Sequence, residues 1–186
     1  MQDFQRNLLE DLRDRVVALQ ARVADATADP DLTAHANDVQ RALGRIDATA
    51  RRMLADPSLG RPELDRQHRA VYQRLNENVF ILESFMVPPI ERFNQHDRRL
   101  TRLVRKLGEQ INWPMPTPLV VADSNSYYMT FPSFQLMKVP AGESQTMLAY
   151  PDLVHEMTHI LMVKERGKLL GGSLIKLFAA FLSRHW

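Results

Sequence analysis

The sequence predicts an α+β fold that is mostly α: an N-terminal helical bundle or set of helical hairpins, then a short β-sheet and one further helix. Three observations lead to this prediction. Apolar residues recur at intervals of three and four over residues 4–111, as on one face of an α-helix. Alternate prolines at Pro114, Pro116 and Pro118 then force an extended backbone. Beyond residue 150 the helical periodicity returns.

The composition limits the classes of protein to which this chain can belong. Its 186 residues, 45% of them hydrophobic, are enough to form one or two domains with a buried core. The 24 basic and 22 acidic residues leave a net charge of +2, which does not indicate nucleic-acid binding. There is no cysteine, so disulfides and thiolate-bound zinc are excluded, and histidine and carboxylate remain as metal ligands.

No segment has the pattern of a signal peptide or a membrane span. The first residues carry acidic side chains in place of a basic region followed by an apolar one. The longest apolar tract, residues 174–182, is interrupted by Lys176 and falls short of the roughly 18 residues needed to cross a bilayer. We therefore expect a soluble, cytoplasmic protein with no membrane span.

The first two predicted helices end at dipeptides that contain proline. An apolar stripe over residues 4–23 is followed by Asp29-Pro30, and a second stripe over residues 39–54 is followed by Asp56-Pro57. A third stripe begins after Pro62, and Pro88-Pro89 is predicted to separate it from a fourth over residues 90–107. Because the connections are short, we expect the helices to be antiparallel neighbours.

The basic and histidine side chains of the helical part are predicted to have structural roles. His68 and His96 lie near apolar stripes, where a lone histidine is more often a packing partner than a metal ligand. A cluster of basic residues near the end of the fourth helix suits either a solvated face, favoured by the helix dipole, or a site for phosphate or acidic lipid. We favour the solvated face. The cluster comprises Arg98, Arg99, Arg102, Arg105 and Lys106.

The composition changes after residue 111, and we predict a division there into a helical domain, residues 1–111, and a second domain, residues 112–186. Residues 119–121, Leu-Val-Val, form a short apolar run that predicts a buried strand. Residues 123–126 predict a turn. A second strand is predicted over residues 127–139, and Phe131, Pro132 and Phe134 favour an irregular or edge position for it.

The motif on which the functional prediction depends lies in the helix that follows. His155 and His159 are four residues apart and share one helix face, so two imidazoles can meet one metal ion. Glu156 stands one position further round, where it can reach water at that metal as a general base. Apolar residues flank the motif and predict a buried helix. Pro151 and Asp152 suit its first turn.

The pattern His155-Glu156-x-x-His159, preceded by strand and loop, resembles that of the zincin-type zinc metallopeptidases. The resemblance covers about residues 112–170. It implies that His155 and His159 bind Zn²⁺, that Glu156 polarises the water, and that peptide bonds are hydrolysed. It also implies an edge strand beside the helix that can pair with an extended peptide.

The sequence departs from the zincin pattern at the third zinc ligand. A metzincin would have glycine and histidine where this chain has Met162 and Glu165, so we expect Glu165 to stay in the helix on another face. A gluzincin takes a glutamate from a following helix, yet residues 166–186 contain no acidic residue. We therefore expect a gluzincin-like domain truncated before its third ligand, with His185 as the one candidate within the chain.

The alternative function is that of a non-catalytic helical interaction module with a relic zincin domain, because more than half of the chain is amphipathic helix. In either case we expect the N-terminal helices to bind a protein partner or to regulate. A peptidase would also bind a peptide or protein substrate. A di-iron bundle is set aside, since it requires a second Glu-x-x-His and the chain has none.

Overall fold

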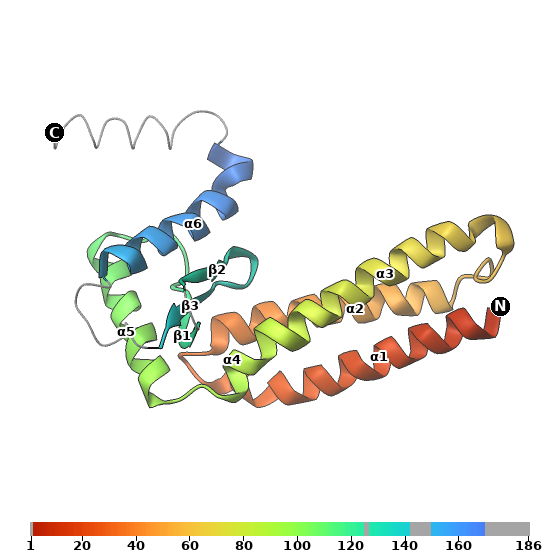
Figure 1. Ribbon diagram of the computed structural model, residues 1–186, viewed down its shortest axis with the longest axis horizontal. Coiled ribbons are helices and arrows are strands. Elements are labelled where there is room, and N and C mark those ends of the chain that lie inside the picture. The colour runs from red at the N-terminus through yellow and green to blue at the C-terminus, as the bar shows by residue number, and fades with distance from the viewer. Residues whose placement is uncertain (1, 125–126, 142–149, 170–186) are drawn as a thin grey trace.

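The computed structural model describes residues 2–124, 127–141 and 150–169, and it confirms an α+β fold that is mostly α (Figure 1). The first two long helices are α1, Gln2–Ala24, and α2, Thr33–Leu54, joined through the short 3₁₀ helix η1, Asp25–Ala28. A second 3₁₀ turn, η2, Pro62–Leu64, leads into α3, Asp65–Ile81. The three long helices lie side by side as a bundle (Figure 1).

The bundle core consists mainly of the apolar stripes predicted from the periodicity. An exception lies at the start of α1. Leu12, Val16 and Leu19 of α1 and Val39 and Leu43 of α2 are completely or almost completely buried. They lie three or four residues apart, so each set occupies one face of its helix. Phe4, predicted to begin the first stripe, is instead 66% exposed.

Pro88 and Pro89 do not separate two helices as predicted. α3 continues through a π-helical turn, η3, Leu82–Met86, into α4, Val87–Glu91, where both prolines occupy the first turn. The N–H of Val87 donates to the carbonyl of Leu82, five residues back. The wider π-helical turn therefore satisfies the last backbone N–H before the two prolines, which have no N–H of their own. The helical path ends only at residues 92–94.

α5, Gln95–Gln110, begins with a reciprocal capping box. The Asn94 side chain accepts from the backbone N–H groups of His96 and Asp97, and the Asp97 carboxylate accepts from the N–H of Asn94. The other Asp97 oxygen accepts from the N–H of Ala122, which ties the start of the helix to the neighbouring strand. The capping box therefore fixes both the start of α5 and its position against the sheet.

The sheet has three strands in the order β1-β3-β2: β1, Leu119–Ser124, β2, Met129–Phe131, and β3, Leu136–Pro140. β1 and β3 are parallel, and β2 is antiparallel to β3. The single strand predicted over residues 127–139 is therefore two strands, split by the 3₁₀ turn η4, Pro132–Phe134, and by Gln135 at a φ of 49°. The predicted edge position applies to β2, whereas β3 is central.

β3 and the first three residues of β1 are buried on both faces and join two cores. Leu119, Val121 and Leu136 belong to the core of the bundle. Val120 and Met137, which alternate with them, belong to a second core with α5 and with α6, Tyr150–Leu169. Packing therefore groups α5 with the sheet and α6, although the predicted division after residue 111 places α5 with the helical domain. The division into two domains stays a prediction.

Three arginines of the predicted basic cluster contact carboxylates within the chain. Arg98, Arg102 and Arg105 reach the carboxylate of Asp31 at 2.8–3.1 Å, and Arg98 also pairs with Asp29. The Asp31 side chain is only 1% exposed. Burial alone would raise its pKa, but the arginines more than offset burial and lower it. The cluster thus attaches α5 to the start of α2 and is not simply a solvated face.

His35 is almost fully buried where α2, the π-helical turn and η4 meet. Its Nδ1 lies 2.8 Å from the carbonyl oxygen of Phe134 and its Nε2 lies 3.0 Å from that of Met86. Burial lowers the pKa of His35 although both carbonyls favour the protonated ring. The neutral ring therefore links three elements but donates to one carbonyl at a time.

None of the helices in residues 2–124, 127–141 and 150–169 is both long and apolar enough to cross a membrane.

We expect Asp31→Asn to lower the free energy of unfolding by about 1–3 kcal/mol, because it leaves three arginines around an uncharged, buried amide. Asp29→Asn is the matched control, since its side chain is 26% exposed and pairs only with Arg98 among the arginines. Urea unfolding followed by circular dichroism gives both values. Equal costs for the two variants would contradict a dominant role for Asp31.

His35 predicts a pH dependence of stability. Because its pKa is lowered in the folded chain from an ordinary 6.5, the unfolded chain binds the proton more readily. Its contribution is complete above pH 6.5 and is lost as the pH falls through the lowered pKa. Urea midpoints should therefore decrease below pH 6.5 in the wild type, and His35→Phe, about 1–3 kcal/mol less stable at pH 7, should lack that component. If the urea midpoint depends on pH in the same way in the wild type and in His35→Phe, His35 is not the source of the pH dependence.

Candidate metal centre

α6 is positioned by one apolar face. Leu153, Met157 and Ile160 are at most 2% exposed and lie at intervals of four and three along that face. On the α5 side, Gly108 leaves room for Trp113, since a Cβ there would lie a tight 3.3 Å from Trp113 but at an ordinary contact distance of 3.7 Å from the Met157 methyl carbon. The described part of α6 starts at Tyr150, and Pro151 and Asp152 lie within it.

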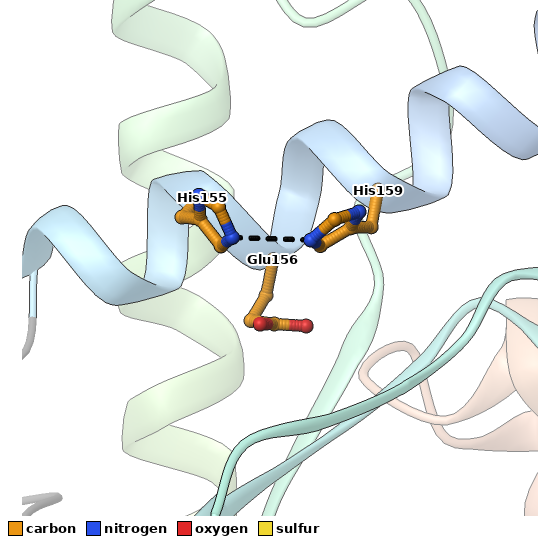
Figure 2. A group of neighbouring side chains, drawn as sticks. All are labelled: His155, Glu156 and His159. Atoms are coloured by element: carbon orange, nitrogen blue, oxygen red, sulfur yellow. Dashed lines mark hydrogen bonds between the residues drawn. The ribbon is translucent and has the colours of Figure 1, made fainter.

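The opposite side of α6 carries the two histidines of the motif. His155 and His159 are exposed, so the prediction of a buried helix holds for one face only. Their Nε2 atoms are 3.1 Å apart, and their rings meet edge to face at 86° with centroids 4.7 Å apart (Figure 2). The i,i+4 spacing therefore brings two ring nitrogens together, as predicted.

The separation of these nitrogens fits a shared metal ion. Zinc–nitrogen bonds of about 2.0–2.1 Å at a tetrahedral angle place two nitrogen ligands about 3.3 Å apart. The observed 3.1 Å is close to that value and also suits an N–H···N hydrogen bond between the rings. Both rings would have to be deprotonated at Nε2 to bind a metal there.

Glu156 completes the cluster from the strand side of the helix. Ligand-type atoms of His155, Glu156 and His159 all lie within 4.8 Å of one another. Figure 2 shows the Glu156 side chain extending away from the helix between the two rings. Its Oε2 accepts a hydrogen bond from the Thr130 hydroxyl of β2, and the residue is half-buried. The carboxylate is thus held beside the two imidazoles and not within the apolar core.

Thr130 is the residue of this site that the sequence prediction missed. It pairs in register with Met137, whose side chain lies in the core beneath α6. Alternation along β2 places Thr130 on that same face of the sheet. A threonine in a predicted strand gives no signal by itself, because the pairing of β2 with β3 decides which face it occupies.

The third zinc ligand is not found among the described residues. There the cluster of potential ligands contains His155, Glu156 and His159. α6 runs without a turn to Leu169, so the expectation that Glu165 stays helical is confirmed. His185 lies outside the described residues. His35 and His68 belong to the bundle, where His35 contacts two carbonyls and His68 faces Asp56.

No family model, curated protein or solved structure matches this chain. The geometry of this site is therefore the basis of the functional proposal.

We expect the wild-type chain to retain one zinc ion after reconstitution and gel filtration, and a His155→Ala, His159→Ala double variant to retain none. The reason is the convergence of the two Nε2 atoms, which the double variant removes entirely. Elemental analysis by mass spectrometry measures the stoichiometry. His96→Ala serves as the control for loss of a histidine elsewhere. Equal zinc content in the wild type and the double variant would exclude the metal centre.

Proposed function

We propose that this protein is a zinc-dependent peptidase that hydrolyses peptide bonds with water. The observation that supports the proposal is the convergence of two histidine Nε2 atoms, 3.1 Å apart, with the Glu156 carboxylate next to them. A metal-dependent hydrolase needs this combination, since it must hold an electrophilic metal and a base at the same point. The edge strand β2 beside the cluster favours a peptide as the substrate.

Each side chain has a separate task in this proposal. His155 and His159 would hold the metal ion, and a bound zinc would supply a Lewis acid that polarises a carbonyl and acidifies water. Glu156 accepts the proton of the attacking water at Oε1, because its Oε2 is hydrogen-bonded to Thr130. Thr130 thereby orients the base. The exposed position of both histidines leaves the metal accessible to a substrate.

The strand next to the site supports a peptide substrate. β2 pairs with β3 on one side, and within the described residues its other side carries no strand. Such an edge offers backbone N–H and C=O groups to an extended peptide. Met129 at the start of β2 is 45% exposed, and the Thr130 hydroxyl reaches Glu156. A peptide along this edge would therefore pass close to the base.

The helical bundle is proposed to regulate the site or bind a protein partner, and the protein to work in the cytoplasm. A specific observation also favours the second candidate function, that of a non-catalytic interaction module. Phe80 and Ile81 of α3 are 57% and 39% exposed on the outside of the bundle. Adjacent apolar side chains in water are a feature of partner-binding surfaces.

We expect Glu156→Gln to reduce peptide cleavage by at least about 100-fold while leaving the zinc content unchanged, since it removes the base and retains the size of the side chain. The assay incubates the zinc-reconstituted chain with a mixture of unstructured peptides and detects new termini by mass spectrometry. Glu109→Gln, an exposed change on α5, is the matched control.

The outcomes separate the two candidate functions. Zinc-dependent cleavage by the wild type and the control, but not by Glu156→Gln, supports the peptidase. A chain that binds zinc stoichiometrically and cleaves no peptide contradicts it and favours the interaction module. Loss of zinc together with activity in Glu156→Gln would show that Glu156 is a ligand and not the base.

A further inference from the structure

A groove lies between α2 and α3, which run side by side in the helical bundle (Figure 1). It has a volume of about 300 Å³ and is partly open to solvent. Its floor is apolar and consists of Ala42, Ile46, Leu75 and Leu82, and Phe134 of η4 also lines it. An apolar groove between two helices is a surface on which a further helix can pack.

Most of the apolar surface that a partner can reach lies at the α3 edge of the groove, because the side chains of the floor are only 1–7% exposed. Ile81 lines the groove, and Val71 lies one turn before Leu75 on the same side of α3. Both Val71 and Ile81 are 39% exposed. They are ten residues apart, which is about 15 Å or three helical turns. A partner that covers both side chains needs an apolar strip of that length.

α1 lies against the other side of α2 and α3 and contacts most of their acidic side chains. These two helices contain four acidic residues. Three of them face α1: Asp47 pairs with Arg13 at 3.0 Å, Asp65 accepts from Gln5, and Glu77 lines a hollow together with Arg15. The fourth, Asp38, pairs with Arg41 of its own helix. The acidic groups of the two helices are therefore directed away from the groove or neutralised.

The groove side of the two helices carries three arginines instead. Arg45 lines the groove, and Arg52 donates to the hydroxyl of Thr49, another lining residue, at 3.2 Å. Arg74 lies one turn before Asn78 on the facing edge. All three arginines are exposed, and none forms an ion pair within the part of the chain that the structure describes. Three uncompensated positive charges along an apolar groove favour a negatively charged partner.

We propose that this groove binds an acidic amphipathic helix of a protein partner, about three turns long. Its apolar side chains, at every third or fourth position, cover the α3 edge and the floor, and the carboxylates beside them pair with the three arginines. The apolar strip favours a helix over a nucleic acid, whose phosphates would contact the arginines alone. This extends the partner-binding role proposed above for the bundle, and it does not depend on the metal centre.

The test measures binding of a fluorescent peptide of about 15 residues to the full chain by anisotropy. The acidic peptide has leucine at every third or fourth position, glutamate beside the leucines and alanine elsewhere. We expect a Kd on the order of 0.1 mM, weakened by about tenfold when the salt concentration is raised from about 0.1 to 0.5 M. A peptide with lysine in place of glutamate, and one with the leucines scattered around the helix, should each bind at least about tenfold more weakly. Equal affinities for the acidic and basic peptides, or no binding of the acidic one at about 1 mM, would overturn the proposal.

Charge-reversal variants locate the binding. The triple variant Arg45→Glu, Arg52→Glu, Arg74→Glu should weaken binding of the acidic peptide by at least about tenfold. A control with the same change of net charge on other exposed surfaces, Arg6→Glu, Arg99→Glu, Lys106→Glu, should weaken it much less. Equal effects of the two triple variants would refute the groove as the site. If the groove variant does not fold, the comparison of the three peptides on the wild type still decides.

The apolar edge is tested separately. Ile81→Ser should weaken binding by about tenfold, whereas Val17→Ser, an exposed apolar position on α1, should not change it. A DNA duplex that binds more tightly than the peptide and depends on the same three arginines would overturn the proposal in favour of a nucleic-acid site.

The metal-centre variant separates this proposal from the peptidase. The His155→Ala, His159→Ala double variant should bind the acidic peptide with the affinity of the wild type. Loss of binding in that variant would place the peptide at the metal centre and would overturn the groove. Unchanged binding by a chain that cleaves no peptide would refute the peptidase and support the groove.

Discussion

The parallel pairing of β1 and β3 is the contact through which the two parts of the structure are joined. Every residue of β3 is buried, and its side chains alternate between the two cores. Leu136 lies in the core of the helical bundle, while Met137 lies beneath α6. A strand in this position must be apolar on both faces, which is why residues 119–121 and 136–139 are short, nearly continuous apolar runs.

One charged residue, Lys138, interrupts the apolar run of this central strand, and its ammonium group has specific partners. Lys138 is 6% exposed on the face toward the bundle. Its ammonium lies 2.8 Å from Asp123 of β1 and within 6 Å of the Phe85 and Phe131 rings. The paired carboxylate and the aromatic faces offset part of the cost of burying the charge. Two neighbouring strands and the π-helical turn are thereby held together.

Polar side chains fix the orientation of the bundle relative to the rest of the chain. Asp31, in the turn just before α2, engages three arginines of α5, and His35 in the first turn of α2 contacts the π-helical turn and η4. The sheet carries β2 at its edge, and β2 carries Thr130 to Glu156. The candidate centre thus depends on contacts that begin in the bundle, although none of its own residues belongs to the bundle.

The sequence by itself determined the elements whose cause is local. Periodicity located the long helices, alternate prolines marked the extended segment after residue 111, and the four-residue spacing placed His155 and His159 on one helix face. One expectation from a local rule was wrong. Pro88 and Pro89 were predicted to break a helix, yet the π-helical turn before them accommodates both.

Only the tertiary structure decided which face each strand residue occupies and which partners charged groups find. The pairing of β2 with β3 joins residues five to nine positions apart and brings Thr130 to Glu156, 26 positions along the chain. The basic cluster of α5 looked like a solvated face because its acidic partner lies 67–74 residues earlier, at Asp31. Side-chain alternation and helical spacing repeat within a few residues, so they can be predicted locally. Contacts between remote segments depend on how the elements pack, and no local pattern contains that information.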